Sequence, residues 1–174
     1  GELLNARLSP DLLESIFYKN SPLHDGAAII SKNEIEAARA LAADHREQHA
    51  ILQLEAIVER LNTQYPNGHE EIPGLYVDMA GYHRGLGHYR QAIQSYLGAI
   101  EAVKRYCPEG GNEDLASLHY AVACLHSSLK REKRGLPHFE SSLDHASKCF
   151  GADHPNTQQI RRKYEEAKAA ISES

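Results

Sequence analysis

The sequence contains no tryptophan, one methionine and only three phenylalanines among its 174 residues. A hydrophobic core must therefore be built from leucine, isoleucine, alanine and the nine tyrosines. The chain has no apolar run near the roughly 18 residues of a membrane span, and it has no surplus of basic residues, because its formal net charge is −5. These absences argue against a membrane-spanning protein and against a nucleic-acid-binding protein.

Cysteine is also scarce. Cys107, Cys124 and Cys149 are odd in number and far apart, so they fit neither a disulfide framework nor a zinc knuckle. This pattern predicts reduced thiols and a cytoplasmic protein. The chain begins at Gly1 without a secretory leader, which we interpret as a processed protein or a fragment.

Helical periodicity dominates the chain from residue 46 onward. Apolar residues recur every three or four positions, and clusters of proline and glycine interrupt them. The pattern predicts a mainly α protein. The predicted helices cover residues 46–64, 73–84, 89–106, 113–129, 133–149 and 155–171.

Two neighbouring helices carry a repeated pattern. The stretch "GHYRQAIQSYLGAI" has Gly87, Tyr89, Ala92, Tyr96 and Ala99 at the spacing of the second half of a tetratricopeptide repeat. The residues that fit the first half are Tyr76, Met79 and Ala80. A shift of 43 residues maps Met79, Ala80, Ala92 and Tyr96 onto Val122, Ala123, Gly135 and Phe139.

Residues 73–171 therefore resemble tetratricopeptide repeats of the kinesin-light-chain variety, and "FGADHPNT" resembles a loop of that variety. The resemblance implies an antiparallel helix-pair stack, with the helix at 46–64 as a front cap and the last helix as a rear cap. A plain helical bundle is the alternative.

Proteins of this type bind peptides or partner helices in a groove. By the family pattern, the inner face would present Val77, Gly81, Arg84, Tyr120, Cys124 and Ser127. A mostly apolar face with one arginine suits a hydrophobic peptide or a neighbouring segment of the chain itself. The alternative is an ordinary surface without a ligand.

The first 40 residues show a different sequence pattern. "LSPDLLESIF" starts a helix at Ser9 and Pro10, and "NSPLHDGA" follows as a turn. Together with "AAIISKNEIEAA", this stretch of residues 5–38 resembles the diadenylate cyclase domain. The resemblance implies that Asp25 works with Mg²⁺ or Mn²⁺ and the ribose of ATP, and that Gly26 and Ala27 lie against the nucleotide.

The resemblance is incomplete. No Arg-His-Arg run after a threonine or serine, which grips phosphates in that family, follows the turn. Family analogy makes residues 28–39 a strand–turn–strand hairpin, whereas helix propensity favours one long helix over 33–62; the choice stays open for 28–39. We therefore expect an inactive cyclase-like segment. A cyclase subunit completed by another chain, and a rearranged fusion, are the alternatives.

Three smaller features remain. His45 and His49 are four apart on a predicted helix and could share a metal, but exposed histidines are the simpler interpretation. The helical pairs His119/His126 and His138/His145 could form a pH-sensitive seam; the alternative is ordinary packing. The basic run "KREKR" at 130–134 could contact an acidic partner; the alternative is a solvent-exposed turn.

The sequence thus predicts two parts: a partial cyclase-like α/β segment at 1–40 and a tetratricopeptide-like helical domain at 41–174. The predicted function is protein or peptide binding without a cofactor, with diadenylate cyclase activity on ATP and Mg²⁺ or Mn²⁺ as the alternative. We expect a protein or peptide partner and self-association, but no nucleic acid or membrane partner.

Overall fold

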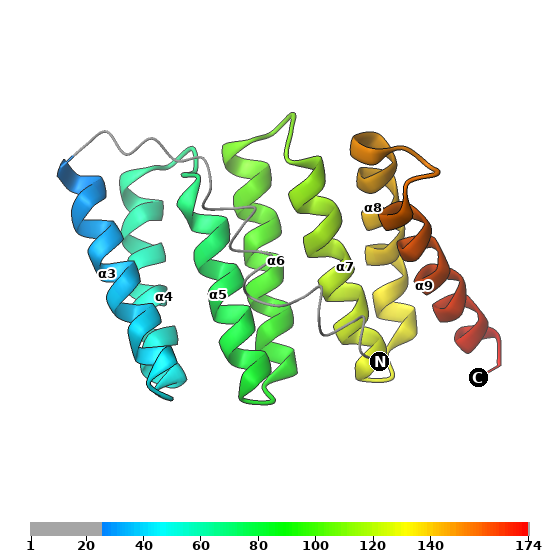
Figure 1. Ribbon diagram of the computed structural model, residues 1–174, viewed down its shortest axis with the longest axis horizontal. Helices are drawn as coiled ribbons and strands as arrows, with labels where there is room; N and C mark the ends of the chain where they lie inside the picture. Colours follow the sequence, from blue (N-terminus) through cyan, green and yellow to red (C-terminus); the bar gives the residue numbers. More distant parts are fainter. Residues whose placement is uncertain (1–25, 174) are drawn as a thin grey trace. The chain divides into compact units, whose positions relative to one another are not determined.

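The computed structural model describes residues 26–173, and within that range all regular structure is α-helical (Figure 1). The mainly α prediction is confirmed. Each predicted helix end lies within two residues of an observed one. The helices are α3 (Gly26–Ala43), α4 (Glu47–Gln64), α5 (Glu71–Gly85), α6 (Tyr89–Tyr106), α7 (Asn112–Ser128), α8 (Glu132–Phe150) and α9 (Pro155–Ser172).

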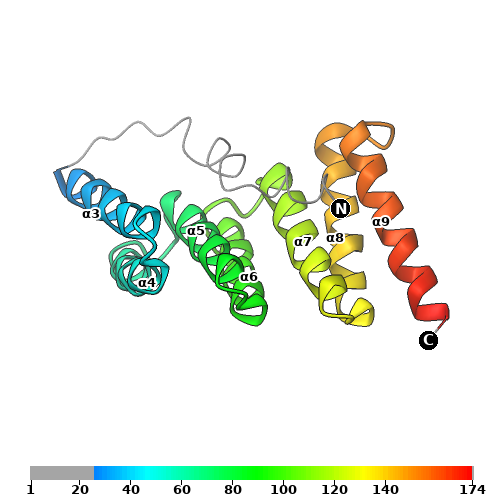
Figure 2. The same ribbon diagram turned by 60° about the horizontal axis from the view of Figure 1, so that its bottom comes forward.

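The helices recur at a nearly constant step along the sequence. Helices α4, α6 and α8 begin at residues 47, 89 and 132, and α5, α7 and α9 begin at residues 71, 112 and 155. The turns after α3, α5 and α7 each contain one residue with positive φ, namely His45 (59°), Gly87 (74°) and Lys130 (56°). One helix–turn–helix unit therefore occurs three times, as α3–α4, α5–α6 and α7–α8, with its positive-φ turn residues 42 and 43 positions apart, and α9 follows the third unit (Figures 1 and 2).

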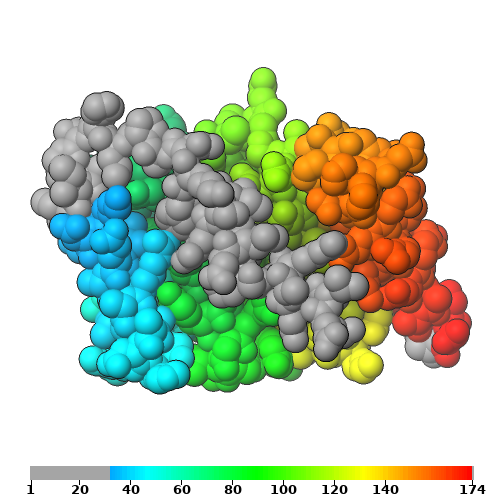
Figure 3. Space-filling model, viewed as in Figure 1, coloured from blue at the N-terminus to red at the C-terminus, as the bar shows by residue number. Residues whose placement is uncertain are grey.

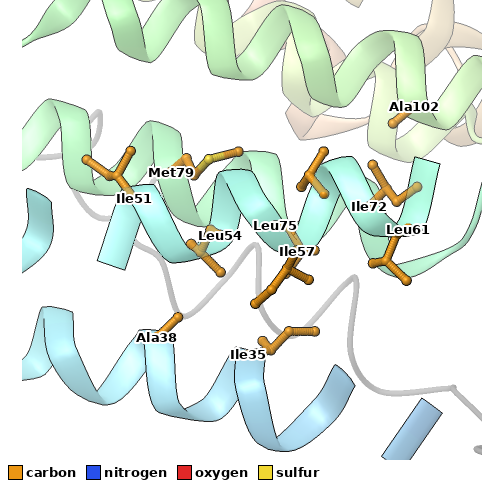
Figure 4. Close-up of a cluster of buried hydrophobic side chains, with 11 residues drawn as sticks. Ile35, Ala38, Ile51, Leu54, Ile57, Leu61, Ile72, Leu75, Met79 and Ala102 are labelled. Carbon is orange, nitrogen blue, oxygen red and sulfur yellow. The ribbon is translucent and has the colours of Figure 1, made fainter. Parts of the chain in front are cut away.

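The contacts divide the chain into two compact units, one ending at Tyr106 and the other beginning at Cys107. In the first unit α3 packs on α4, α4 on α5 and α5 on α6. The apolar stripes of these helices meet in one buried cluster (Figure 4). Its residues are Ile35, Ala38, Ile51, Leu54, Ile57, Val58, Leu61, Ile72, Leu75, Met79 and Ala102.

In the second unit α7 packs on α8 and α8 on α9, and the surface of α8 and α9 is continuous in the space-filling view (Figure 3, orange to red). Phe139 is the largest fully buried side chain of this unit. The hydroxyl of Ser142 donates a hydrogen bond of 2.7 Å to the Ala116 carbonyl. At Gly135 an added Cβ would lie 3.0 Å from the Ala123 carbonyl oxygen, so α7 and α8 meet closely because this position has no side chain.

The front of the described chain corrects three expectations. Residues 28–39 lie in α3, so the hairpin interpretation of that stretch is wrong. The single long helix over 33–62 is also wrong, because the chain turns at Asp44–Arg46, where the Arg46 N–H bonds back to Leu41. The predicted front cap α4 instead pairs with α3, whose Ile35 and Ala38 it covers.

The α/β character predicted for residues 1–40 is not found in their described part, which is helical. Helix α3 also runs across the boundary predicted between residues 40 and 41. A functional division at that boundary stays a prediction. None of the helices between residues 26 and 173 is long and apolar enough to cross a membrane.

Candidate functional site

The cyclase-like turn lies at the start of the described chain. Asp25, the predicted catalytic and metal-binding residue, lies outside the described residues. Gly26 and Ala27 are the first two residues of α3. The backbone predicted to lie against the nucleotide is therefore helical at both positions.

The predicted groove residues fall into two sets of three. Val77, Gly81 and Arg84 lie on α5 at the spacing of one helical face, with Val77 buried and the other two half-buried. Arg84 also hydrogen-bonds the hydroxyl of Tyr96, a fully buried residue of α6 whose pKa burial raises. Arg84 therefore ties α5 to α6.

The second set, Tyr120, Cys124 and Ser127, occupies one face of α7. Cys124 is buried, Tyr120 and Ser127 are half-buried, and the Tyr120 ring meets the edge of Phe139 at a centroid distance of 6.0 Å. Each set shares a face within its own unit. Their joint role as a peptide groove stays a prediction.

Sequence reasoning missed a cavity of about 670 Å³ among α4, α5 and α6. Val58, Tyr76 and Met79 give it an apolar base, and Glu55 and Glu59 from α4 add negative charge. The lining also includes polar residues from all three helices: Asn62, Thr63, His83, Gln91, Gln94 and Ser95. Residues from three helices form it, so no local motif could have revealed it.

His83 gives this cavity a specific polar group. Its Nδ1 atom is buried and has no hydrogen-bond partner among the described residues. Burial, and then the nearby His88, lower the pKa of His83, while Glu55 opposes them. A neutral imidazole offers one donor and one acceptor nitrogen, so His83 combines a place in the cavity lining with a buried ring nitrogen that is not used in a hydrogen bond among the described residues.

The structure brings the four histidines of α7 and α8 together. The Nδ1 atoms of His119 and His138 are 3.0 Å apart, which requires one ring to donate and the other to accept. His145 stacks on His119 at 5.9 Å, and His126 stacks on His138 at 6.1 Å. The Nδ1 atom of His145 also lies 2.8 Å from the Asn112 side-chain oxygen. The predicted pairs are thus one contiguous row at the α7–α8 contact.

Metal binding receives no support from the described part of the chain. No group of three or more histidine, cysteine, aspartate or glutamate side chains there could hold a metal ion. The prediction that His45 and His49 share one helix is wrong. His45 lies in the turn before α4, whereas His49 lies in α4.

A family model and several curated proteins match the front of the chain. Residues 1–54 match the family described as DisA bacterial checkpoint controller nucleotide-binding. Residues 1–54 are similar to diadenylate cyclases. The resemblance inferred from "NSPLHDGA" is thus confirmed for this cyclase-like segment, residues 1–54, and the tetratricopeptide resemblance is not tested by it.

Individual relatives cover a short stretch of this segment. Diadenylate cyclase CdaS of Bacillus thuringiensis (strain BMB171) is 55% identical over 38 residues, which are 22% of this chain and 19% of that protein. Cyclic di-AMP synthase CdaA of Bacillus subtilis (strain 168) is 60% identical over 38 residues, which are 22% of this chain and 14% of that protein. The chain therefore spans less than a fifth of the length of these curated relatives.

Proposed function

We propose that the helical part of the chain is a protein-interaction module of the tetratricopeptide type that binds a peptide or a partner helix. One observation carries the proposal: three helix pairs follow one another from α3 to α8, each joined by a turn with one positive-φ residue, and these residues are 42 and 43 positions apart. Repeated helix pairs are the architecture in which each pair buries the apolar face of its neighbour.

The burial of equivalent residues supports this interpretation. Residues that the 43-residue shift brings into correspondence are buried in both repeats. The exposed fractions are 3% and 0% for Met79 and Val122, 0% for both Ala80 and Ala123, and 1% for both Tyr96 and Phe139. Ala92 is fully buried, and Gly135, its equivalent, is buried too. If the alanine spacing were a coincidence, equivalent large and small residues would not be buried at the same positions in both helix pairs.

Two surfaces of the first unit could receive a peptide. The predicted one is the α5 face of Val77, Gly81 and Arg84. The other is the cavity among α4, α5 and α6, whose apolar base and two glutamates suit a basic amphipathic peptide. The volume of this cavity lies in the range of small binding sites.

Glycine substitutions on α5 separate the two surfaces. A Cβ built at Gly81 or at Gly85 has no neighbouring atom within 4 Å, so Gly81→Gln and Gly85→Gln start the same side chain in open space at both positions. Peptides selected from a random display library would be titrated against both variants by fluorescence anisotropy. If the α5 face binds, G81Q weakens binding about tenfold or more and G85Q changes it little.

Binding through the cavity has its own signature. Glu55→Gln combined with Glu59→Gln would lower the affinity for a basic peptide, whereas G81Q would leave that affinity unchanged. Affinity that survives all of these changes, or a library without any selected binder, would contradict the proposed module.

The match of residues 1–54 favours a second candidate, nucleotide binding by the cyclase-like segment. Asp25 would hold Mg²⁺ or Mn²⁺ together with ATP, and the first N–H groups of α3, at Gly26 and Ala27, would face phosphate. The metal would lower the pKa of the 3′-hydroxyl and screen phosphate charge. Because α3 replaces the expected hairpin, catalysis would need a second chain to complete the site.

Calorimetric titration with a non-hydrolysable ATP analogue and Mn²⁺ tests this candidate. Saturable heat that disappears in Asp25→Ala but persists in Asp44→Ala, an exposed turn residue, would establish a working half-site. The absence of heat from the unaltered chain would remove the candidate. Cytoplasmic location and self-association stay predictions.

A further inference from the structure

The turn between α7 and α8 carries an unusual concentration of positive charge. Lys130, Arg131, Lys133 and Arg134 line a cavity of about 510 Å³ with Ala170 and Ile171 from the end of α9. We propose that this cavity, named here the α7–α8 basic cavity, binds a phosphorylated small molecule through its phosphate group.

The cations are not neutralised within the described part of the chain. The ion pairs found there involve none of these four side chains. Glu132 is the one acidic residue in the lining. Residues 130–134 therefore carry a formal net charge of +3, and their cations repel one another unless a further anion is present.

The position of the charge makes this repulsion larger. Arg131 is the N-cap residue of α8, and Lys133 and Arg134 lie in its first turn. The N-terminus of a helix is already positive, so cations there are unfavourable and anions are favourable. No side-chain hydrogen bond caps α8, so no side chain of this turn satisfies the N–H groups at the start of the helix.

The corresponding turn of the preceding repeat shows that the fold does not require these charges. Gly87 occupies the positive-φ position there and Lys130 occupies it here. The residues after Gly87 are His88, Tyr89, Arg90 and Gln91, which carry a single formal cation. The same turn therefore forms with one cation. The additional positive charge is not needed for folding, and binding of an anionic ligand accounts for it.

The shape and chemistry of the cavity favour a small molecule over an acidic protein. Its volume is in the range of small-molecule sites. Arginine guanidinium groups bind phosphate through paired hydrogen bonds, and Ala170 and Ile171 supply apolar surface for the remainder of the molecule. Figure 1 shows the end of α9 beside the beginning of α8, as two antiparallel neighbours require.

Calorimetric titration of the full chain tests the proposal, with inorganic pyrophosphate, ATP and adenosine as probes and with EDTA present. Omitting divalent metal and using the Asp25→Ala background separates this cavity from the cyclase-like segment. Pyrophosphate and ATP are expected to bind saturably, and adenosine, which lacks phosphate, is expected not to bind. An acidic peptide of equal charge serves as a further probe.

The decisive variant is Arg131→Gln with Arg134→Gln. It should weaken pyrophosphate binding at least tenfold, with circular dichroism confirming that the helices persist. The matched control is Arg161→Gln with Arg162→Gln, which removes the same charge from α9 and should change the affinity less than twofold.

A second readout needs no variant. His126 is buried, and Arg131 and Arg134 add to burial in lowering its pKa. A phosphate bound between these arginines should raise the His126 pKa, measured by NMR titration. Absence of saturable binding up to about 5 mM pyrophosphate, equal losses in the two arginine variants, tighter binding of the acidic peptide, or an unchanged His126 pKa would each overturn the proposal.

Discussion

Arg39 on α3 donates two hydrogen bonds, from Nε at 3.0 Å and from Nη2 at 2.9 Å, to the same oxygen of Asp78 on α5. The side chain of Asp78 is 7% exposed and that of Arg39 is 25% exposed. Arg39 lies in the cyclase-like segment, and Asp78 lies outside it, in the predicted helical repeats. The ion pair therefore joins α3, whose Arg39 lies within the match at residues 1–54, to α5.

Breaking this pair should be costly. Arg39→Ala leaves a buried carboxylate without its cation, so the free energy of unfolding should fall by about 2–3 kcal/mol, somewhat less than for a fully buried pair. Arg60→Ala is the matched control, because Arg60 pairs with Glu34 of α3 in an exposed position. That loss should stay below about 1 kcal/mol.

Urea denaturation of both variants provides the measurement. The double variant R39A/D78A should lose less than the sum of the two single losses, because removing both charges leaves no unpaired ion. Equal losses for R39A and R60A would show that the buried pair does not hold α3 in place.

Replacing two helical glycines by alanine should change the free energy of unfolding in opposite directions. An alanine Cβ at Gly98 of α6 would lie 2.7 Å from the Tyr76 ring, whereas at Gly81 of α5 it meets nothing within 4 Å. Gly98→Ala should therefore destabilise by about 1–2 kcal/mol through overpacking. Gly81→Ala should stabilise by about 0.5–1 kcal/mol, because alanine favours the helix.

Thermal and urea unfolding would compare these variants. Replacing the ring in Tyr76→Leu should recover most of the G98A loss, since the clash is with that ring. A stabilising G98A would mean that Tyr76 moves into the adjacent cavity without cost.

The sequence predicted the helices well because proline and glycine mark their ends and apolar residues follow the helical period. It left residues 28–39 open between a hairpin and a helix, because resemblance and helix propensity disagreed there, and the structure shows a helix. The outcome depends on contacts distant in sequence: Ile35 and Ala38 are buried against α4, which makes α3 the first half of a repeat. The two cavities were missed for the same reason, since the α7–α8 basic cavity joins residues 130–134 to Ala170 and Ile171.

Asp114 should make stability depend on pH in the acidic range. Burial, and then Glu113, raise its pKa from the ordinary 3.8 to about 6. Between these values the folded protein holds a proton that the unfolded chain has lost, so stability falls as pH rises through the window and is constant above it. Asp114→Asn should raise the free energy of unfolding by about 1 kcal/mol at neutral pH, after allowance for solvent screening.

Below the window the benefit of D114N should vanish, because Asp114 is then protonated in both states. Urea unfolding at several pH values would measure this, with exposed Asp153→Asn as the control. An equal benefit at pH values below 3.8 and at neutral pH would indicate a cause other than ionisation.

His126 should produce the opposite dependence. Its pKa is lowered from 6.5 by burial first and then by Arg131 and Arg134, and its Nδ1 has no partner among the described residues. As pH falls through 6.5 the unfolded chain takes up a proton before the folded one, so stability falls.

His126→Leu removes the titrating group and keeps the Cβ that contacts the Gly135 region. The variant should lose less stability than the unaltered chain between about pH 7 and pH 5. Arg131→Gln with Arg134→Gln should raise the His126 pKa toward the unfolded value. The decline should still begin near pH 6.5, but it should end at a higher pH and the total loss of stability should be smaller. Identical pH profiles for the unaltered chain and H126L would contradict this prediction and would make His83, whose pKa burial also lowers, the next residue to substitute.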